Sequence, residues 1–166
     1  EDDEKLMTNS STYLWGKDFL ITPILKDSVK TKEVYFPKSA NWINFYTDEK
    51  VDGGQTKTIN VDKNSIPTYV RSGTFILMSN LLQTTDNYKA DKLELHYYYD
   101  ASVKESERIF YNDDGLTANA FEKGKYEMLE FEAEVEKEVA QSAIWWTYRD
   151  DIPTKKLKPY NVMNSH

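Results

Sequence analysis

Apolar and polar residues alternate along much of this chain, as they do in half-buried β-strands. In KLELHYYYD, residues 92–100, the two leucines and every second tyrosine share one face. From Leu129 to Glu136 the alternation is strict, with four apolar residues facing in and four glutamates facing out. Because glutamate is usually exposed, this row predicts a solvated sheet face. Shorter candidate strands are KEVYFP, NWINFY, KTINVD, PTYVR and TFILM.

Turn signals such as Asp52-Gly53-Gly54 and Ser72-Gly73 separate these runs at a spacing typical of β-sandwiches. Helix signals are few: residues 2–14 fit one or two helical turns, and residues 136–146 are ambiguous between helix and strand. The polar segment QTTDNYKAD, residues 83–91, predicts a boundary between two β-rich blocks. We therefore predict an all-β protein of two small antiparallel β-sandwich domains in tandem, residues 1–84 and 85–166, with little helix.

The composition narrows the choice of partners. The net charge is −7 with a pI near 4.9, so we expect no nucleic-acid partner. The longest apolar runs, FLITPIL and TFILM, are far too short to cross a bilayer, so we expect no membrane partner. The absence of cysteine does not indicate a compartment. The first residues, EDDEK, suggest a piece cut from a longer protein.

Residue types that carry metal or nucleophilic chemistry are sparse. There are two histidines and no cysteine, and His96 lies within a predicted strand beside Tyr97, so we expect no zinc site. A serine presented by a G-x-S-x-G elbow is missing, and so is a glycine-rich phosphate loop. We therefore expect no cofactor and no catalytic residue in this chain.

The segment RIFYNDDGLTANAFEKGKYEMLEFE, residues 108–132, places two acidic residues beside a glycine. Asp113 and Asp114 do not follow the alternating spacing of an EF-hand calcium loop, although a calcium site built with other loops stays open. Adjacent residues on a turn also do not hold two carboxyl groups across a sugar. Since Asp-Gly is a strong turn signal, we predict that both acids form a turn and bind no metal.

Four segments, in order, are similar to the motifs of one known enzyme family. YLWGKDFLITPIL is similar to F-x-G-x-D-L-L-V-A-P-V-L, and KEVYFPKSANWINFYTDEKVDGGQ to V-Y-L-P-x-G-x-W-x-D-F-W-T-G-x-x-Y-x-G-G. NSIPTYVRSGTFILM resembles I-P-x-F-V-R-A-G-S-I-I-P, and RIFYNDDGLTANAFEKGKYEMLEF resembles F-x-L-Y-E-D-D-G-x-x-Y-x-Y-E-K-G-E-Y. Together they resemble glycoside hydrolase family 31, in which the first motif leaves the catalytic barrel. Asn44 and Asn112 depart from the family's usual Asp and Glu, and residues 132–166 match nothing.

The resemblance implies a function for the parent protein. Members of this family hydrolyse α-glucosidic or α-xylosidic bonds with retention, using an aspartate nucleophile and an aspartate acid in a (β/α)8 barrel. Both aspartates belong to segments upstream of those matched here. The chain thus resembles the proximal and distal C-terminal β-domains of such an enzyme, and we expect it to be catalytically inactive alone, with the barrel of the same polypeptide as partner.

Aromatic side chains are the remaining candidates for contact with a partner. We expect Trp15, Phe19 and Trp42 to face the barrel, because Tyr13–Leu25 resembles the barrel exit. An alternative is a carbohydrate-binding module, in which Trp42, Tyr46, Trp145 and Trp146 stack on sugar. Core or domain packing is the more ordinary use of such residues. The parent's substrate is set by barrel loops that this chain lacks.

Overall fold

The computed structural model describes residues 3–7, 11–79, 81–84, 93–134 and 143–145. This part of the chain is nearly all strand, which confirms the all-β prediction, and its single helix, α1 (Glu4–Met7), is one turn long. No helix within it is long and apolar enough to cross a membrane. The strands are β1 (Tyr13–Trp15), β2 (Phe19–Ile21), β3 (Thr31–Phe36), β4 (Trp42–Asn44), β5 (Lys50–Val51), β6 (Gln55–Asn60), β7 (Thr68–Arg71), β8 (Thr74–Ser79), β9 (Leu93–Tyr98), β10 (Glu105–Asp113), β11 (Tyr126–Glu134) and β12 (Ala143–Trp145).

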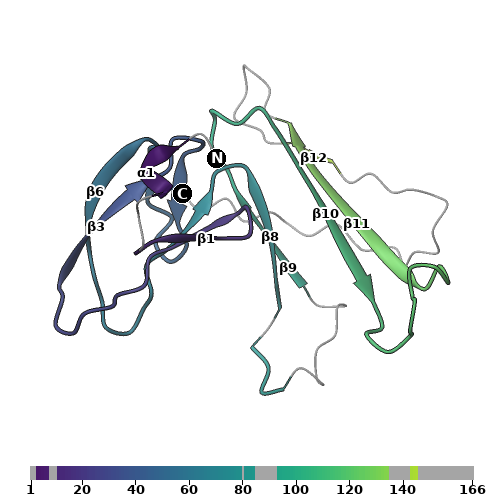
Figure 1. Cartoon of the computed structure of the whole chain (residues 1–166). Coiled ribbons are helices and arrows are strands. Elements are labelled where there is room, and N and C mark those ends of the chain that lie inside the picture. The colour runs from purple at the N-terminus through teal and green to yellow at the C-terminus, as the bar shows by residue number, and fades with distance from the viewer. Residues whose placement is uncertain (1–2, 8–10, 80, 85–92, 135–142, 146–166) are drawn as a thin grey trace.

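The described strands form four antiparallel sheets that follow one another across the molecule (Figure 1). The pair β3–β6 lies at one end, beside a five-stranded sheet in the order β1-β2-β7-β4-β5. The pair β8–β9 comes next, and the sheet β10-β11-β12 lies at the other end. Each pair of neighbouring sheets shares a hydrophobic cluster, so the sheets pack as successive layers.

The five-stranded sheet is buried on both faces in its middle. Trp42 of β4 points into the cluster shared with β3–β6, and the next residue, Ile43, points into the cluster shared with β8–β9. In β7, Tyr69 likewise points into the first cluster and Val70 into the second. Because neighbouring side chains of a strand point to opposite faces, a strand covered on both sides needs consecutive apolar residues. This explains why NWINFY and PTYVR are less clearly alternating than the strands further along the chain.

The β8–β9 pair is likewise covered on both faces. Ile76 and Tyr98 pack toward the five-stranded sheet, whereas Phe75 packs with Phe131 and Ala133 of β11. Strands on the two sides of the predicted boundary at residue 84 therefore pair along their whole length, from Thr74 opposite Tyr98 to Ser79 opposite Leu93. How the chain divides into domains stays a prediction.

Gly73 makes the sharp passage from β7 to β8. Its φ is +76°, a conformation that residues with a side chain rarely adopt. A Cβ atom at this position would lie 2.5 Å from Val103 Cγ1 and 2.9 Å from Ser106 Oγ. Its N–H donates to the carbonyl of Tyr98 at 2.7 Å. The glycine thus lets the segment before β10 pack directly against the β7–β8 turn.

The predicted glutamate row lies on β11. Phe131 and Ala133 are buried, while Glu130, Glu132 and Glu134 occupy the opposite face, half-buried or exposed. The predicted inward and outward sets are therefore confirmed as far as Glu134. Val135 and Glu136, the last two residues of the predicted run, lie outside the described residues.

Candidate functional site

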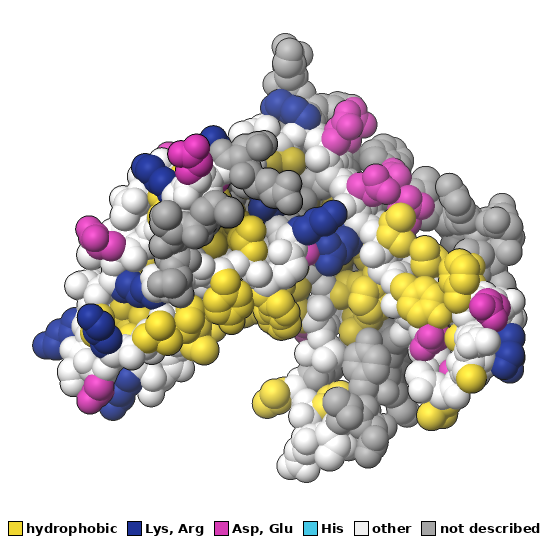
Figure 2. All heavy atoms as spheres, in the orientation of Figure 1, with side chains coloured by type: hydrophobic (Ala, Val, Ile, Leu, Met, Phe, Trp, Pro, Cys, Tyr) yellow, Lys and Arg dark blue, Asp and Glu magenta, His cyan; other side chains and the backbone are white. Residues whose placement is uncertain are grey.

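The β1 edge of the five-stranded sheet exposes large apolar side chains. Trp15 is 68% exposed and Tyr13 is 54% exposed. Trp15 lies opposite Phe19 in the β1–β2 register, so both point to the face that β8–β9 covers further along the sheet. Figure 2 shows the resulting band of hydrophobic side chains over β1. This end of the face has no cover from the described part of the chain.

Four aromatic rings continue this exposed edge across the sheet. The Trp15 and Phe19 ring centroids are 5.6 Å apart, those of Phe19 and Phe45 are 6.1 Å apart, and those of Phe45 and Tyr46 are 5.2 Å apart. Tyr46 is 59% exposed. We call Trp15, Phe19, Phe45 and Tyr46 the aromatic strip. The structure therefore joins two residues predicted to face a barrel with one predicted to bind sugar.

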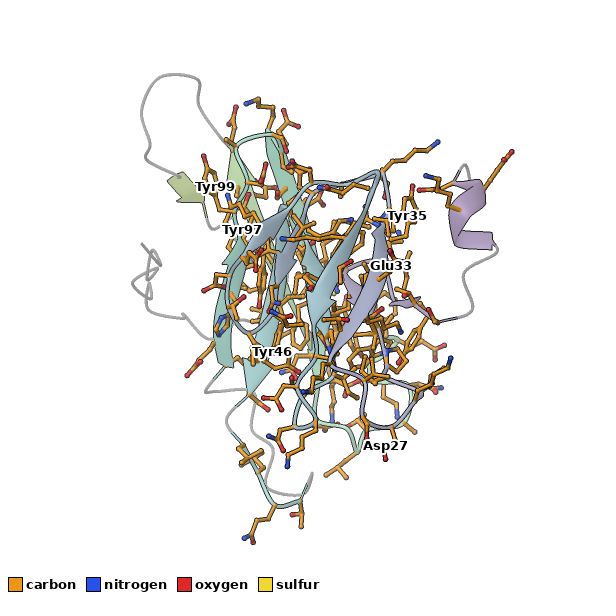
Figure 3. The ribbon with its side chains drawn as sticks, turned by 90° about the vertical axis from the view of Figure 1, so that its left-hand side faces the viewer. Asp27, Glu33, Tyr35, Tyr46, Tyr97 and Tyr99 are labelled. Atoms are coloured by element: carbon orange, nitrogen blue, oxygen red, sulfur yellow. The ribbon has the colours of Figure 1, made fainter. Side chains whose placement is uncertain are left out.

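Tyr46, labelled in Figure 3, lies in a hydrogen-bonded turn that follows β4. The Asn44 Oδ1 atom accepts hydrogen bonds from the backbone N–H groups of Tyr46 at 2.9 Å and Thr47 at 3.2 Å. The Asn44 N–H donates to the carbonyl of Glu49 at 2.9 Å, and Asp48 closes the turn with a φ of 59°. An aspartate, the usual family residue at position 44, would accept the same two bonds. The departure at Asn44 thus leaves the turn intact.

Two arginines hold the turn of the β1–β2 hairpin. Arg71 of β7 donates its backbone N–H to the Asp18 carbonyl and its Nε–H to the Lys17 carbonyl, both at 2.8 Å. Arg108 of β10 donates from Nη1 to Asp18 Oδ2 at 2.7 Å. Charge-assisted bonds of this length are strong for their class. The hairpin that carries Trp15 is therefore held both by its own sheet and by the far β10-β11-β12 sheet.

Trp42 is not part of any surface. Its side chain is fully buried between β3–β6 and the five-stranded sheet, and its Nε1–H donates to the Pro37 carbonyl at 3.0 Å. The Arg71 guanidinium lies 5.0 Å from the centre of its ring. A side chain without exposed surface stacks on no sugar and contacts no second domain. The prediction that Trp42 faces the barrel or binds carbohydrate is therefore wrong, because strand alternation points it to the covered face.

The tryptophans predicted near the C-terminal end remain untested. The backbone of β12 pairs with β11, with Trp145 opposite Glu132. The side chain of Trp145 and all of Trp146 lie outside the described residues. Their sugar-binding role stays a prediction.

Asp113 and Asp114 form a turn, as predicted. Asp113 Oδ1 accepts from the Gly115 N–H at 2.8 Å, and Asp114 Oδ1 accepts from the N–H groups of Leu116 and Thr117 at 2.9 and 2.7 Å. The Thr117 hydroxyl donates to Asp114 Oδ2 at 2.6 Å. This hydroxyl, together with the two N–H groups, lowers the pKa of Asp114 to about 2. The charge of Asp114 is thus engaged by its own turn.

A second group of exposed rings lies beside this turn. The Tyr111 and Tyr126 centroids are 5.4 Å apart with an interplanar angle of 23°, and those of Phe121 and Tyr126 are 4.8 Å apart with an angle of 24°. Phe121 is 63% exposed and Tyr111 is 41% exposed. We call Tyr111, Phe121 and Tyr126 the distal ring cluster. Hydrophobic side chains also gather over β10 and β11 in Figure 2.

Comparison with known proteins identifies the family. The C-terminal domain of glycosyl hydrolase family 31 matches residues 1–76. These residues belong to a family 31 C-terminal domain. An α-xylosidase of Saccharolobus solfataricus is 34% identical over 126 residues, which are 75% of this chain and 17% of that protein. An α-glucosidase of Bacillus thermoamyloliquefaciens is 31% identical over 133 residues, 80% of this chain and 16% of that protein.

Solved structures extend the likeness of this family 31 chain beyond the matched domain. A family 31 dextranase of Flavobacterium johnsoniae, in complex with isomaltotriose, superimposes with a TM-score of 0.73 at 26% identity, covering 81% of this chain and 16% of the dextranase. An α-xylosidase of Xanthomonas citri gives a TM-score of 0.71 at 25% identity, covering 80% of this chain and 14% of that enzyme. The resemblance to family 31 is therefore confirmed. The chain spans only about a sixth of the length of these relatives.

Some surface residues of this family 31 chain were missed by sequence reasoning. The sequence did not single out Phe45, although strand alternation places it on the face opposite to the buried Trp42. The distal ring cluster was overlooked because Tyr111, Phe121 and Tyr126 lie up to 15 residues apart and meet only through the β10–β11 register, in which Asp113 is opposite Tyr126. The pairing of Arg108 with Asp18, 90 residues earlier, left no local signal in the sequence.

Proposed function

We propose that this chain is the non-catalytic C-terminal region of a retaining α-glycosidase and that it packs against and supports the enzyme's (β/α)8 barrel. The parent enzyme would hydrolyse α-glucosidic or α-xylosidic bonds, as the names of its relatives suggest. The chain itself turns over neither class of substrate on this proposal.

The uncovered β1 edge carries the proposal. Burying one large apolar side chain completely stabilises a protein by roughly 1.5–3 kcal/mol. Because Trp15 is 68% exposed, most of this stabilisation is absent unless another surface covers it. Exposed apolar patches of this kind mark contacts with other protein surfaces. Trp15 also lies within the segment that resembles the barrel exit, so the barrel is the nearest candidate to cover it.

The shape of the aromatic strip favours a protein partner over a sugar. Its successive rings are turned by 33°, 60° and 88° relative to one another. Such an uneven surface suits interdigitating side chains, whereas a sugar ring stacks best on a flat platform. With Trp42 in the core, the alternative of a carbohydrate-binding module keeps only Tyr46 among the described residues predicted for it.

The test uses the polypeptide that contains both the barrel and this chain. Trp15→Ser should lower its melting temperature by several degrees, corresponding to about 2 kcal/mol. In the isolated chain the same change should have little effect, because Trp15 is already exposed. Phe121→Ser is the matched control, since Phe121 is 63% exposed but lies at the far sheet. An equal response to Trp15→Ser in both proteins would contradict the proposal.

A further inference from the structure

We propose that the distal ring cluster is a binding surface for neutral oligosaccharides, separate from the aromatic strip. Within each of its two stacked pairs the rings are nearly parallel, with interplanar angles of 23° for Tyr111 and Tyr126 and 24° for Phe121 and Tyr126. Phe121 stacks one ring face on Tyr126 and is still 63% exposed, so its other face is open to solvent. An open ring face of this kind is a platform for the apolar C–H face of a pyranose. The inference does not depend on contact with a barrel.

Polar groups with remaining hydrogen-bonding capacity lie beside the rings. The Tyr111 hydroxyl donates to Asp113 Oδ2 at 2.8 Å, and Gly115 N–H donates to Asp113 Oδ1. Each carboxylate oxygen accepts up to two hydrogen bonds, so both oxygens of exposed Asp113 retain acceptor capacity. The Tyr111 oxygen also remains an acceptor. Hydroxyl groups at the edge of a stacked sugar would donate to these positions.

The charge of the loop indicates a neutral ligand. Residues 113–125 contain three carboxylates and two ammonium groups, so neither anions nor cations are strongly attracted. An apolar protein surface docked here would strip water from the Asp113 carboxylate without replacing its hydrogen bonds, which is costly. A polyhydroxyl ligand replaces those bonds while covering the rings. Leu116, 90% exposed in the same loop, adds apolar surface that a sugar chain of several units would reach.

The test is titration of the purified 166-residue chain with isomaltotriose and with maltotriose, followed by calorimetry and by NMR shifts of the loop amides. We expect binding in the millimolar range, weakened at least tenfold by Phe121→Ala. Asp113→Asn, which keeps the rings, should weaken binding less. Tyr46→Ala is the matched control, because Tyr46 is 59% exposed in the aromatic strip, and it should bind as the wild type does. Thermal melts check that each variant is folded.

Two results would overturn this inference. One is the absence of saturable binding of either trisaccharide by the folded wild-type chain. The other is binding that survives Phe121→Ala or is lost in Tyr46→Ala, because the sugar would then bind at a surface other than the distal ring cluster. Neither result bears on barrel packing, which is measured with Trp15 variants and without sugar.

Discussion

Asp48 occupies a backbone conformation that suits glycine. Its φ of 59° lies in the left-handed region, where a Cβ atom crowds the following carbonyl. The family motif that matches this segment has glycine at the corresponding place, after W-T. The turn that presents Tyr46 therefore carries a small strain in this chain.

Asp48→Gly should stabilise the isolated chain by up to about 1 kcal/mol, because glycine adopts this φ without crowding. Chemical denaturation of the two proteins measures the change. Asp52→Gly serves as control, since Asp52 is exposed and is not among the residues with positive φ. Equal effects of the two substitutions would mean that the strain at Asp48 is negligible.

Asp114 should make the stability depend on pH in the acid range. Its pKa falls from an ordinary 3.8 to about 2 in the folded chain. A lowered folded-state pKa stabilises fully above about pH 4, and this stabilisation disappears as the pH falls from about 4 to about 2. The melting temperatures of the wild type and Asp114→Asn should therefore differ at about pH 6 and converge below about pH 2. A difference in melting temperature that stays constant across this pH range would contradict a stabilising role for the Asp114 carboxylate.

Residue patterns predicted the strands better than they predicted which side chains stay exposed. Trp15 and Trp42 both lie in short apolar runs, and both were expected to face a partner. Trp42 is buried because β3–β6 covers its side of the sheet, whereas Trp15 lies at an edge strand that no described element covers. Alternation fixes which residues share a face, but not which face receives a covering layer.

The β1–β2 hairpin is the element that carries the proposed interface, and its turn depends on distant residues. Arg108 donates to Asp18, whose side chain is only 15% exposed. Pairs that are partly buried and bonded at such short distance couple more strongly than freely exposed ones.

A double-mutant cycle with Asp18→Asn and Arg108→Met should give a coupling energy of about 1 kcal/mol. Hydrogen exchange should quicken in Tyr13–Ile21 of either single variant. The Lys57–Glu49 pair is the control, with side chains 41% and 60% exposed, and its coupling should be only a few tenths of a kcal/mol. Coupling energies that are indistinguishable in the two cycles would argue against a special role for Arg108.

Sequence reasoning at the element scale found the strands but not all their partners. KLELHYYYD was predicted as a strand from its alternation, and β9 confirms it. Its pairing with TFILM, across a polar segment expected to separate two domains, was not foreseen. Both strands have apolar side chains on both faces. Such a pattern indicates that each strand is covered on two sides, but it does not show which other strand pairs with it.

At the scale of the whole molecule, the described residues form a row of sheets with an exposed edge near one end and an exposed ring cluster near the other (Figures 1 and 2). Clusters of buried side chains link each sheet to the next, so the chain can present its β1 edge on a firm support. Four local motifs predicted the family and comparison with known proteins confirmed it, whereas the proposed role rests on the side chains that this row of sheets leaves exposed.

Oxidative footprinting of Trp15, read by mass spectrometry, tests the proposed barrel contact most directly. The isolated chain and the longer polypeptide with the barrel are labelled under the same conditions, with Phe121 as an internal reference. We predict that Trp15 is oxidised readily in the isolated chain and strongly protected in the longer polypeptide, while Phe121 reacts alike in both. Equal oxidation of Trp15 in the two proteins would contradict the account, because the β1 edge would then remain exposed beside the barrel.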